Sequence, residues 1–271
     1  MKKVLTIGLA GLLALSCTVR QERVVEWYFD AACSTKASIS GEGVFSWQKE
    51  DRIDVWNETE DAFVPFTTIA GLGRFMGMAP ENAVFSGAAF YPAGIAGTPS
   101  QVTLPALYGS PEEAAASFPM FAAVDKDDKV LHFKHLGALL TIMVERAQPQ
   151  LTRLTLRSPG TGLSGTFDLS AKKEVAGKPG NGTVGVSFSL SQEGTLSITL
   201  PLPTGTYPLS VCLGNQENPD MLVLSTASSL TFERAGHYRL RSFDYLTERY
   251  AIEENAGMET LTLEDESSLW E

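Results

Sequence analysis

The chain has 271 residues, of which 44% are hydrophobic, and its formal net charge is -11 at pH 7. This length and hydrophobic fraction are typical of a globular protein with a sizeable core, in one large domain or two ordinary ones, and argue against disorder throughout the chain. The acidic balance argues against a nucleic-acid-binding protein, because phosphate binding requires a basic patch.

The first seventeen residues read MKKVLTIGLAGLLALSC, with two lysines, a short apolar run and then Cys17. The run is short for a membrane-spanning helix and is typical of a secretory signal. Its end, LALSC, resembles the lipobox of bacterial lipoproteins, in which the cysteine is acylated. The resemblance predicts a signal peptide over 1–17 and lipidation of Cys17, whose acyl chains would hold the mature protein on a membrane. An ordinary cleaved signal is the alternative.

Two further cysteines, Cys33 and Cys212, follow the signal. An exported protein is able to oxidise such a pair to a disulfide. Their separation in sequence does not determine their distance in space, so we expect two unpaired, partly buried thiols, with the bridge as the alternative.

Residues 24–243 consist of short apolar or alternating runs separated by Gly, Pro, Asn, Asp and Ser, which is typical of many strands joined by turns. The clearest period-2 strands are expected at 183–190, 195–200, 207–213 and 237–243. Strands at this spacing predict an all-β protein, and the length exceeds what one β-sandwich needs. We therefore expect two consecutive β-sandwich domains with very little helix.

The one helix that the pattern predicts covers 110–117, SPEEAAAS, with Ser110 as N-cap and Pro111 in the first turn. The apolar segment 67–77 contains two interrupting glycines and is expected to be a loop or distorted turn. The polar stretch RAQPQLT places the boundary between the sandwiches near Pro149. The expected domains are therefore 18–149 and 150–249, followed by an acidic tail over 250–271.

The stretch VLHFKHLGALLTIMVE, residues 130–145, combines an H-x-x-H pattern with an apolar run. Its β-branched residues and the preceding turn predict a buried strand near the end of the first sandwich. Residues three apart in a strand point to opposite faces, so His132 and His135 are not expected to bind one metal ion, and at least one should be exposed.

Sequence motifs of catalysis are missing. Residues 162–166, GLSGT, lack the last glycine of G-x-S-x-G, and there is no phosphate-binding glycine loop. We expect no catalytic residue, no cofactor and no metal, and we do not expect an enzyme, although a scattered triad or carboxylate pair leaves no sequence signature.

Aromatic residues are frequent in the first half, and exposed aromatic rings could form a platform for sugars. At their alternating spacing most are expected in the core, but a surface glycan-binding lipoprotein stays open as the alternative function. The residues concerned are Trp27, Tyr28, Phe29, Trp47, Trp56, Phe63 and Phe66.

Five stretches, together with the lipobox, resemble the fimbrillin family, the Mfa-like pilin and anchor lipoproteins of Bacteroidetes type V pili. Each motif is weak alone, but their order over 51–240 matches the order in that family. The stretches are DRIDVW (51–56), FSGAAFYP (85–92), FPMFA (118–122), LHFKHLGALL (131–140) and FERAGHYRL (232–240).

The resemblance implies two transthyretin-like β-sandwiches and a palmitoylated lipoprotein at the outer-membrane surface. It implies a fimbrial subunit, either a pilin, a tip or an anchor, that serves adhesion and contacts other pilus subunits. A host protein or glycan ligand is implied but not identified. Subunits of that family assemble by strand exchange, in which a segment of one subunit fills a groove in the next. A protease releases their first strand at a basic residue, for which Arg20 and Arg23 are candidates here.

The tail contains METLTLE, in which Leu261 and Leu263 alternate on one face, and it is a candidate donor strand. An acidic disordered tail is the equal alternative, because seven acids and no base follow Arg249. If the tail is the donor, deletion of 258–271 should abolish polymerisation and leave the melting temperature unchanged.

Overall fold

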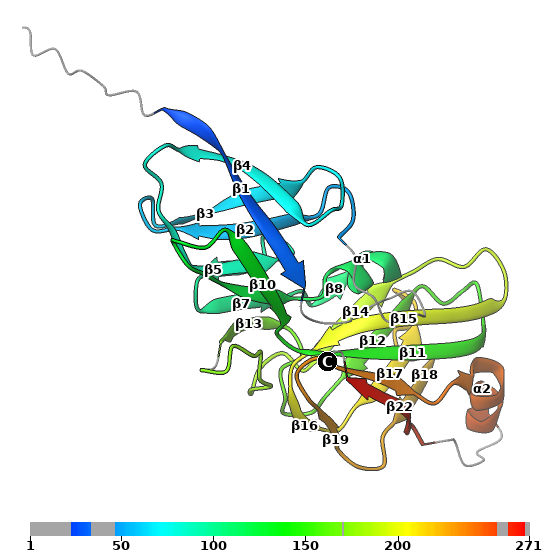
Figure 1. The fold of residues 1–271 in the computed structure, drawn as a ribbon. Coiled ribbons are helices and arrows are strands. Elements are labelled where there is room, and N and C mark those ends of the chain that lie inside the picture. Colours follow the sequence, from blue (N-terminus) through cyan, green and yellow to red (C-terminus); the bar gives the residue numbers. More distant parts are fainter. Residues whose placement is uncertain (1–22, 34–46, 170, 254–259, 269–271) are drawn as a thin grey trace, which may run out of the picture.

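The described residues form mainly β-strands, together with two helices (Figure 1). The computed structural model describes residues 23–33, 47–169, 171–253 and 260–268. The all-β class that the sequence predicted is confirmed. Within these residues no helix has the length and apolar character needed to cross a membrane.

The N-terminal half is a closed barrel in which the strands follow the order β1, β10, β9, β5, β2, β3, β4. Closure depends on β1, which pairs antiparallel with β4 over most of its length and parallel with β10 over its last four residues. The members are β1 (Val24–Cys33), β2 (Arg52–Asn57), β3 (Ala62–Thr68), β4 (Arg74–Pro80), β5 (Phe85–Tyr91), β9 (Met120–Val124) and β10 (Val130–His135).

A barrel replaces the open sandwich that was expected here. Apolar and polar residues alternate along a strand in both architectures, so the pattern does not distinguish them. The apolar faces of the strands point inward, where Phe29, Ile53, Phe66, Phe75 and Phe133 form the barrel core.

The C-terminal half contains two five-stranded sheets packed on one core, to which Leu140, Leu154, Leu200 and Val211 contribute. The β11 sheet comprises β15 (Gly194–Leu202), β11 (Ala138–Ala147), β20 (Gly236–Leu240), β22 (Leu263–Ser268) and β21 (Phe243–Asp244). The β12 sheet comprises β18 (Leu222–Ser225), β17 (Ser210–Gly214), β12 (Arg153–Arg157), β14 (Thr183–Ser187) and β8 (Leu107–Tyr108).

Two small sheets complete the fold. They are formed by β6 (Ala96–Thr98), β7 (Gln101–Leu104) and β13 (Gly165–Asp168), and by β16 (Gly205–Tyr207) and β19 (Leu230–Phe232). Phe90 and Phe121, on the outer face of the barrel, pack with Phe167 and Val175 from the C-terminal part of the chain. This third core joins the two halves.

The N-terminal part of the chain contributes a segment to the C-terminal half. After β5 the chain leaves the barrel, adds β8 to the β12 sheet, forms α1 (Pro111–Ala116) against β15 and returns to the barrel as β9. It leaves finally at Leu136 and Gly137, between β10 and β11. A boundary near Pro149 would place β11 in the same domain as the barrel. The hydrogen bonds of β11, however, join this strand to β15, β20 and β21. The apolar run is continuous across this passage, so its composition gave no sign of the change of sheet.

The helix predicted at 110–117 is present as α1, and the Glu113 amide donates to the Ser110 hydroxyl at 3.2 Å, as expected of an N-cap. A second helix, α2 (Tyr245–Glu253), lies where the acidic tail was expected to begin. The segment 67–77 is not a loop throughout, because β3 ends at Thr68 and β4 begins at Arg74. Gly71 and Gly73 occupy the turn, with φ of 67° and 77°, and Gly77 lies in β4.

The four predicted period-2 strands are present in the β11 and β12 sheets. They correspond to β14, β15, β17 and β20, with ends that differ by a few residues from those expected. The run at 237–243 includes β21 as well.

Candidate functional site

The two histidines of the H-x-x-H stretch lie on opposite faces of β10, as the strand reading predicted. His132 is exposed and His135 is fully buried. Neither ring nitrogen of His135 has a hydrogen-bond partner, and the ring stacks on Phe118 with centroids 4.0 Å apart. Burial, and secondly the charge of Arg234, lowers the pKa of His135 to about 3. Among the described residues no group of three or more His, Cys, Asp or Glu side chains could hold a metal ion.

The motif stretches 131–140 and 232–240 meet where the chain passes from barrel to sandwich. The guanidinium of Arg234 donates to the carbonyl oxygens of His135 and Lys172, both at 2.6 Å. The Ala235 amide donates to the Gly137 carbonyl at 2.7 Å. These motif residues therefore have a structural role, because their hydrogen bonds hold the backbone where the chain passes from barrel to sandwich.

Gly137 is required at this passage by close backbone packing. A Cβ atom there would collide with the Leu202 carbonyl oxygen at the end of β15. The position therefore has room for glycine alone unless the backbone shifts.

The third histidine belongs to a polar row across the β11 sheet. The Thr141 hydroxyl lies 2.8 Å from the Thr199 hydroxyl and 2.9 Å from Nε2 of His237. The strand register places Thr199 opposite Thr141 and brings His237 onto the next strand. The row is a set of cross-strand contacts that stabilises pairing.

The candidate donor residues of the tail lie in the chain's own fold. Leu261 is 4% exposed and belongs to the C-terminal core, and its amide donates to the Ser225 carbonyl at 3.2 Å. Leu263 begins β22, stands opposite Leu240 of β20 and packs partly against the same core. Both leucines thus face one core, and β22 is an outer strand with β20 as its partner.

Among the described residues, no strand pairs with β1 along the first half of one of its edges. Val24 stands opposite Pro80 of β4, and proline has no amide, so this pair is one whose backbone groups point away from each other. Val24, Glu26 and Tyr28 therefore direct their N–H and C=O groups away from β4, while β10 begins its pairing only at Asp30. Asp30 follows the same alternation, because its amide points away from β4 and donates to the Lys129 carbonyl on the β10 side.

Of the two candidate cleavage residues, Arg20 is outside the described residues, and Arg23 is exposed directly before β1 and paired with Glu81 at 3.7 Å. Cleavage after either residue would remove the segment before β1 and leave β1 in the barrel. Cys17 is also outside the described residues, as is the side chain of Cys33, whereas Cys212 is a buried free thiol. Burial raises the pKa of the Cys212 thiol to about 11.

The seven aromatic residues considered for sugar binding do not form an exposed platform. Phe29, Trp47 and Phe66 belong to the barrel core, where they make edge contacts with other rings. The remaining four are half-buried, namely Trp27, Tyr28, Trp56 and Phe63.

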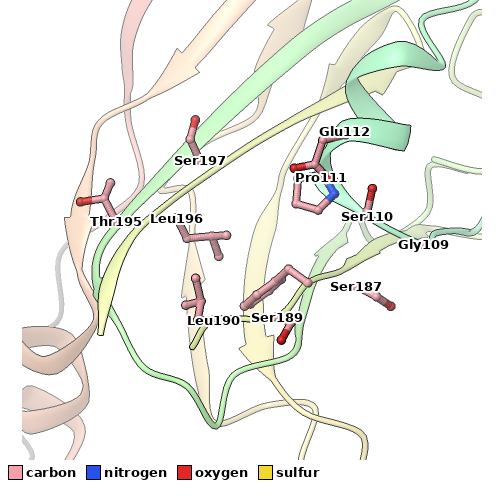
Figure 2. A pocket seen from close by; sticks show the side chains of 11 residues that line it. Gly109, Ser110, Pro111, Glu112, Ser187, Ser189, Leu190, Thr195, Leu196 and Ser197 are labelled. Atoms are coloured by element: carbon pink, nitrogen blue, oxygen red, sulfur yellow. The ribbon is translucent and has the colours of Figure 1, made fainter. Parts of the chain in front are cut away.

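The sequence analysis did not identify β15 as an outer strand, which pairs only with β11 in the part of the chain that the structure describes. It also did not identify the pocket lined by residues of α1, of β15 and of 187–190 (Figure 2). A usable signal was present. Proline inside an alternating strand indicates an edge position, and Pro201 lies within β15.

No protein-family model matches the chain, and no curated protein matches it. Among solved structures, a candidate cell adhesion protein from Bacteroides ovatus is similar at a TM-score of 0.57 and 15% identity, over 93% of this chain and 99% of the other. One from Bacteroides uniformis gives 0.47 and 14%, over 89% and 97%. The tip fimbrial protein Mfa3 from Porphyromonas gingivalis gives 0.38 and 10%, over 90% and 99%. The first of these shows the fold alone: at 15% identity, the chain shares the fold of that candidate cell adhesion protein.

Proposed function

We propose that the chain is a subunit of a cell-surface fimbrium, as pilin, tip or anchor, which serves adhesion and joins its neighbours by β-strand addition. The fold supports a fimbrial role. The observation that carries the proposal is the position of β22, because the last strand of the described chain pairs on one side only, with β20. A strand with one neighbour leaves its sheet at a lower cost than a central strand.

The donor segment would be the tail that contains Leu261 and Leu263. In the free subunit these leucines complete the chain's own core, so donation requires that the tail exchange one set of contacts for another. Such an exchange leaves the number of ladder hydrogen bonds nearly unchanged, and the gain lies in linking two subunits.

The subunit would be held at the outer membrane by acyl chains on Cys17. Residues 18–23 would then connect the lipid to β1. An anchor subunit would keep this lipid, whereas a pilin or tip would be released by cleavage at Arg20 or Arg23. The proposal includes a division into an N-terminal and a C-terminal domain, which the separate barrel and sandwich cores support. The transthyretin-like β-sandwich is proposed for the C-terminal domain.

The test is polymerisation of purified protein carrying Cys17→Ser, followed by sedimentation and electron microscopy before and after treatment with a trypsin-like protease. Polymers are expected from the full chain, and none from a chain that lacks 258–271. The variant Arg23→Gln, matched for size, reports whether cleavage at this residue is required. A full chain that stays monomeric with and without protease, and that is retarded in gels containing polysaccharide, would favour the glycan-binding alternative instead.

A further inference from the structure

A pocket of 530 Å³ lies where the two sheets of the sandwich meet the start of α1. One side is α1 itself, a second is the segment 187–190 after β14, and the third is β15 at 195–197 (Figure 2). Its volume lies within the range of small-molecule sites, about 300–1,000 Å³. The pocket therefore has room for a ligand of the size of a sugar ring.

The floor of the pocket is apolar. Leu196 points from β15 toward α1, Leu190 lies on the same side, and Pro111 faces them from the start of the helix (Figure 2). Phe188 and Leu190 are half-buried, because they pack in part against the sandwich core. Phe188 is the single aromatic residue of the lining, and it was not among the seven aromatic residues considered for sugar binding.

One side of the pocket carries a fixed carboxylate. Glu112 accepts hydrogen bonds from its own amide and from the Ser110 hydroxyl, which lower its pKa, so it is ionised at neutral pH. An exposed carboxylate held in this way keeps further lone pairs for a ligand. The neighbouring Glu113 is not part of the lining, since its carboxylate accepts from the Gly109 amide at 2.7 Å.

The side formed by β15 offers backbone hydrogen-bonding groups. Among the described strands, β15 pairs with β11 alone. Pro201 stands opposite Leu139, and because proline lacks an amide, this pair points its backbone groups apart. By alternation Ser197 also directs its N–H and C=O groups away from β11, and Ser197 lines the pocket. A hydroxyl group both donates and accepts, so a ligand rich in hydroxyls is able to bond either group.

The combination fits a pyranose ring, which has a face of C–H groups and a rim of hydroxyls. The C–H face matches the apolar floor, and the hydroxyls match the carboxylate and the strand edge, because hydrogen bonds to an ionised group are the stronger kind. An acyl chain fits less well, since it would leave these polar groups without partners.

The charge of the lining limits the sugar further. Glu112 is the single charged side chain among the eleven lining residues. Arg153 stands opposite Ser187 on β12 but is not part of the lining. A sulfated, phosphorylated or uronic-acid sugar would therefore meet a like charge and no cation in this pocket.

We propose that this pocket binds a neutral hexopyranose, with its C–H face on Phe188 and the leucines and with hydroxyls bonded to Glu112 and to the β15 edge. The inference goes beyond subunit assembly. It rests on the fimbrial proposal only in supplying a ligand class for adhesion, whereas sugar binding itself requires no filament.

The test uses the full chain carrying Cys17→Ser, isotope-labelled and titrated in NMR experiments. The probes are the methyl glycosides of glucose and galactose and the matching uronates, in which a carboxylate replaces the hydroxymethyl group. At least one neutral glycoside should bind with a dissociation constant of about 1 mM and shift amide signals of 187–190 and 195–197. Its uronate should bind at least about threefold more weakly. No saturable binding of either neutral glycoside up to about 100 mM, or equal binding of the uronate, would overturn the proposal.

Matched variants locate the site. Phe188→Ala removes the ring and should weaken binding of the neutral glycoside about tenfold. Glu112→Gln keeps an acceptor but removes the charge, so the preference for the neutral glycoside over its uronate should disappear. Glu113→Gln makes the same change of charge on the same helix outside the pocket and should leave both affinities within about twofold of the parent. If Phe188→Ala fails a circular dichroism check of folding, the comparison of Glu112→Gln with Glu113→Gln still decides.

The remaining outcomes separate this inference from the proposed function. Sugar binding by a chain that forms no filaments overturns the fimbrial role and leaves the pocket intact. Filaments of a chain that binds neither neutral glycoside overturn the sugar site alone. Sugar binding that neither Phe188→Ala nor Glu112→Gln changes would place the sugar elsewhere on the molecule and contradict the proposal.

Discussion

Arg234 donates a 2.6 Å hydrogen bond through Nε to the backbone carbonyl of His135, the last residue of the barrel strand β10. The two residues are far apart in sequence but belong to two of the stretches that resemble fimbrillin motifs. Half-burial of Arg234 lowers the pKa of its guanidinium, so this bond forms in a partly desolvated environment. Through this contact the stretches 131–140 and 232–240 together hold the backbone between barrel and sandwich.

Replacement of Arg234 by alanine should destabilise the protein. It removes the bonds to the His135 and Lys172 carbonyls, and we expect a loss of about 3 kcal/mol in the free energy of unfolding, because bonds to charged donors are the stronger kind. Denaturant unfolding measures this change. Arg239→Ala, at an exposed position of β20, is the matched control and should change the free energy by less than about 0.5 kcal/mol. Equal losses of free energy in the two variants would contradict the stabilising role of the Arg234 hydrogen bonds.

Acid should destabilise the protein through His135. Its pKa falls from 6.5 to about 3 on folding, so between these values the unfolded chain binds the proton and the folded chain does not. The contribution of neutral His135 to the free energy of unfolding is fully present above pH 6.5. It is lost as the pH falls towards 3, at up to about 1.4 kcal/mol per pH unit. His135→Phe keeps the stacking on Phe118 and should flatten the pH dependence in this window. Parallel stability curves for parent and variant would refute the role of this histidine.

Gly137→Ala should be strongly destabilising, because the new Cβ would collide with the Leu202 carbonyl. A backbone shift at the passage from β10 to β11 should cost about 2 kcal/mol or more. Gly97→Ala is the control, since a Cβ there meets no atom within 4 Å. Thermal unfolding should therefore separate the two variants by several degrees, and similar melting temperatures would contradict the crowding at Gly137.

Truncation of the tail should now lower the melting temperature, which corrects the expectation from sequence. Leu261 is buried and β22 pairs with β20, so removal of 258–271 opens the C-terminal core. Leu261→Ala alone should cost about 3 kcal/mol, whereas Thr262→Ala, at the exposed neighbour, should cost little. An unchanged melting temperature after truncation would mean that the tail does not belong to the folded core.

The local features of this fold could be predicted from sequence. Alternation identified β14, β15, β17 and β20, and Ser110 with Pro111 identified α1, because these signals depend on neighbours in the chain. The opposite orientation of His132 and His135 followed from the period of a strand. The helix α2 was missed because its composition resembles that of the acidic tail.

The closed barrel and the unpaired edges could not be predicted in this way. Closure depends on the parallel pairing of β1 with β10, two segments about a hundred residues apart, and nothing in either segment names its partner. The alternation of Leu261 and Leu263 was correctly read, yet which core receives them is a tertiary question. Pro201 is the exception, since this one residue indicates that β15 is an outer strand.

The segment between β5 and β9, which joins the sandwich, has a consequence for the way such a protein can diversify. Ala114 of α1 and Tyr108 of β8 belong to the sandwich core, although they come from the part of the chain that lies between two barrel strands. A genetic crossover between β10 and β11 would join the barrel of one relative to the sandwich of another. The sandwich core would then receive β8 and α1 from a different protein. Recombination within such proteins should succeed in exposed loops and fail at the junction, so the two halves are expected to be inherited together.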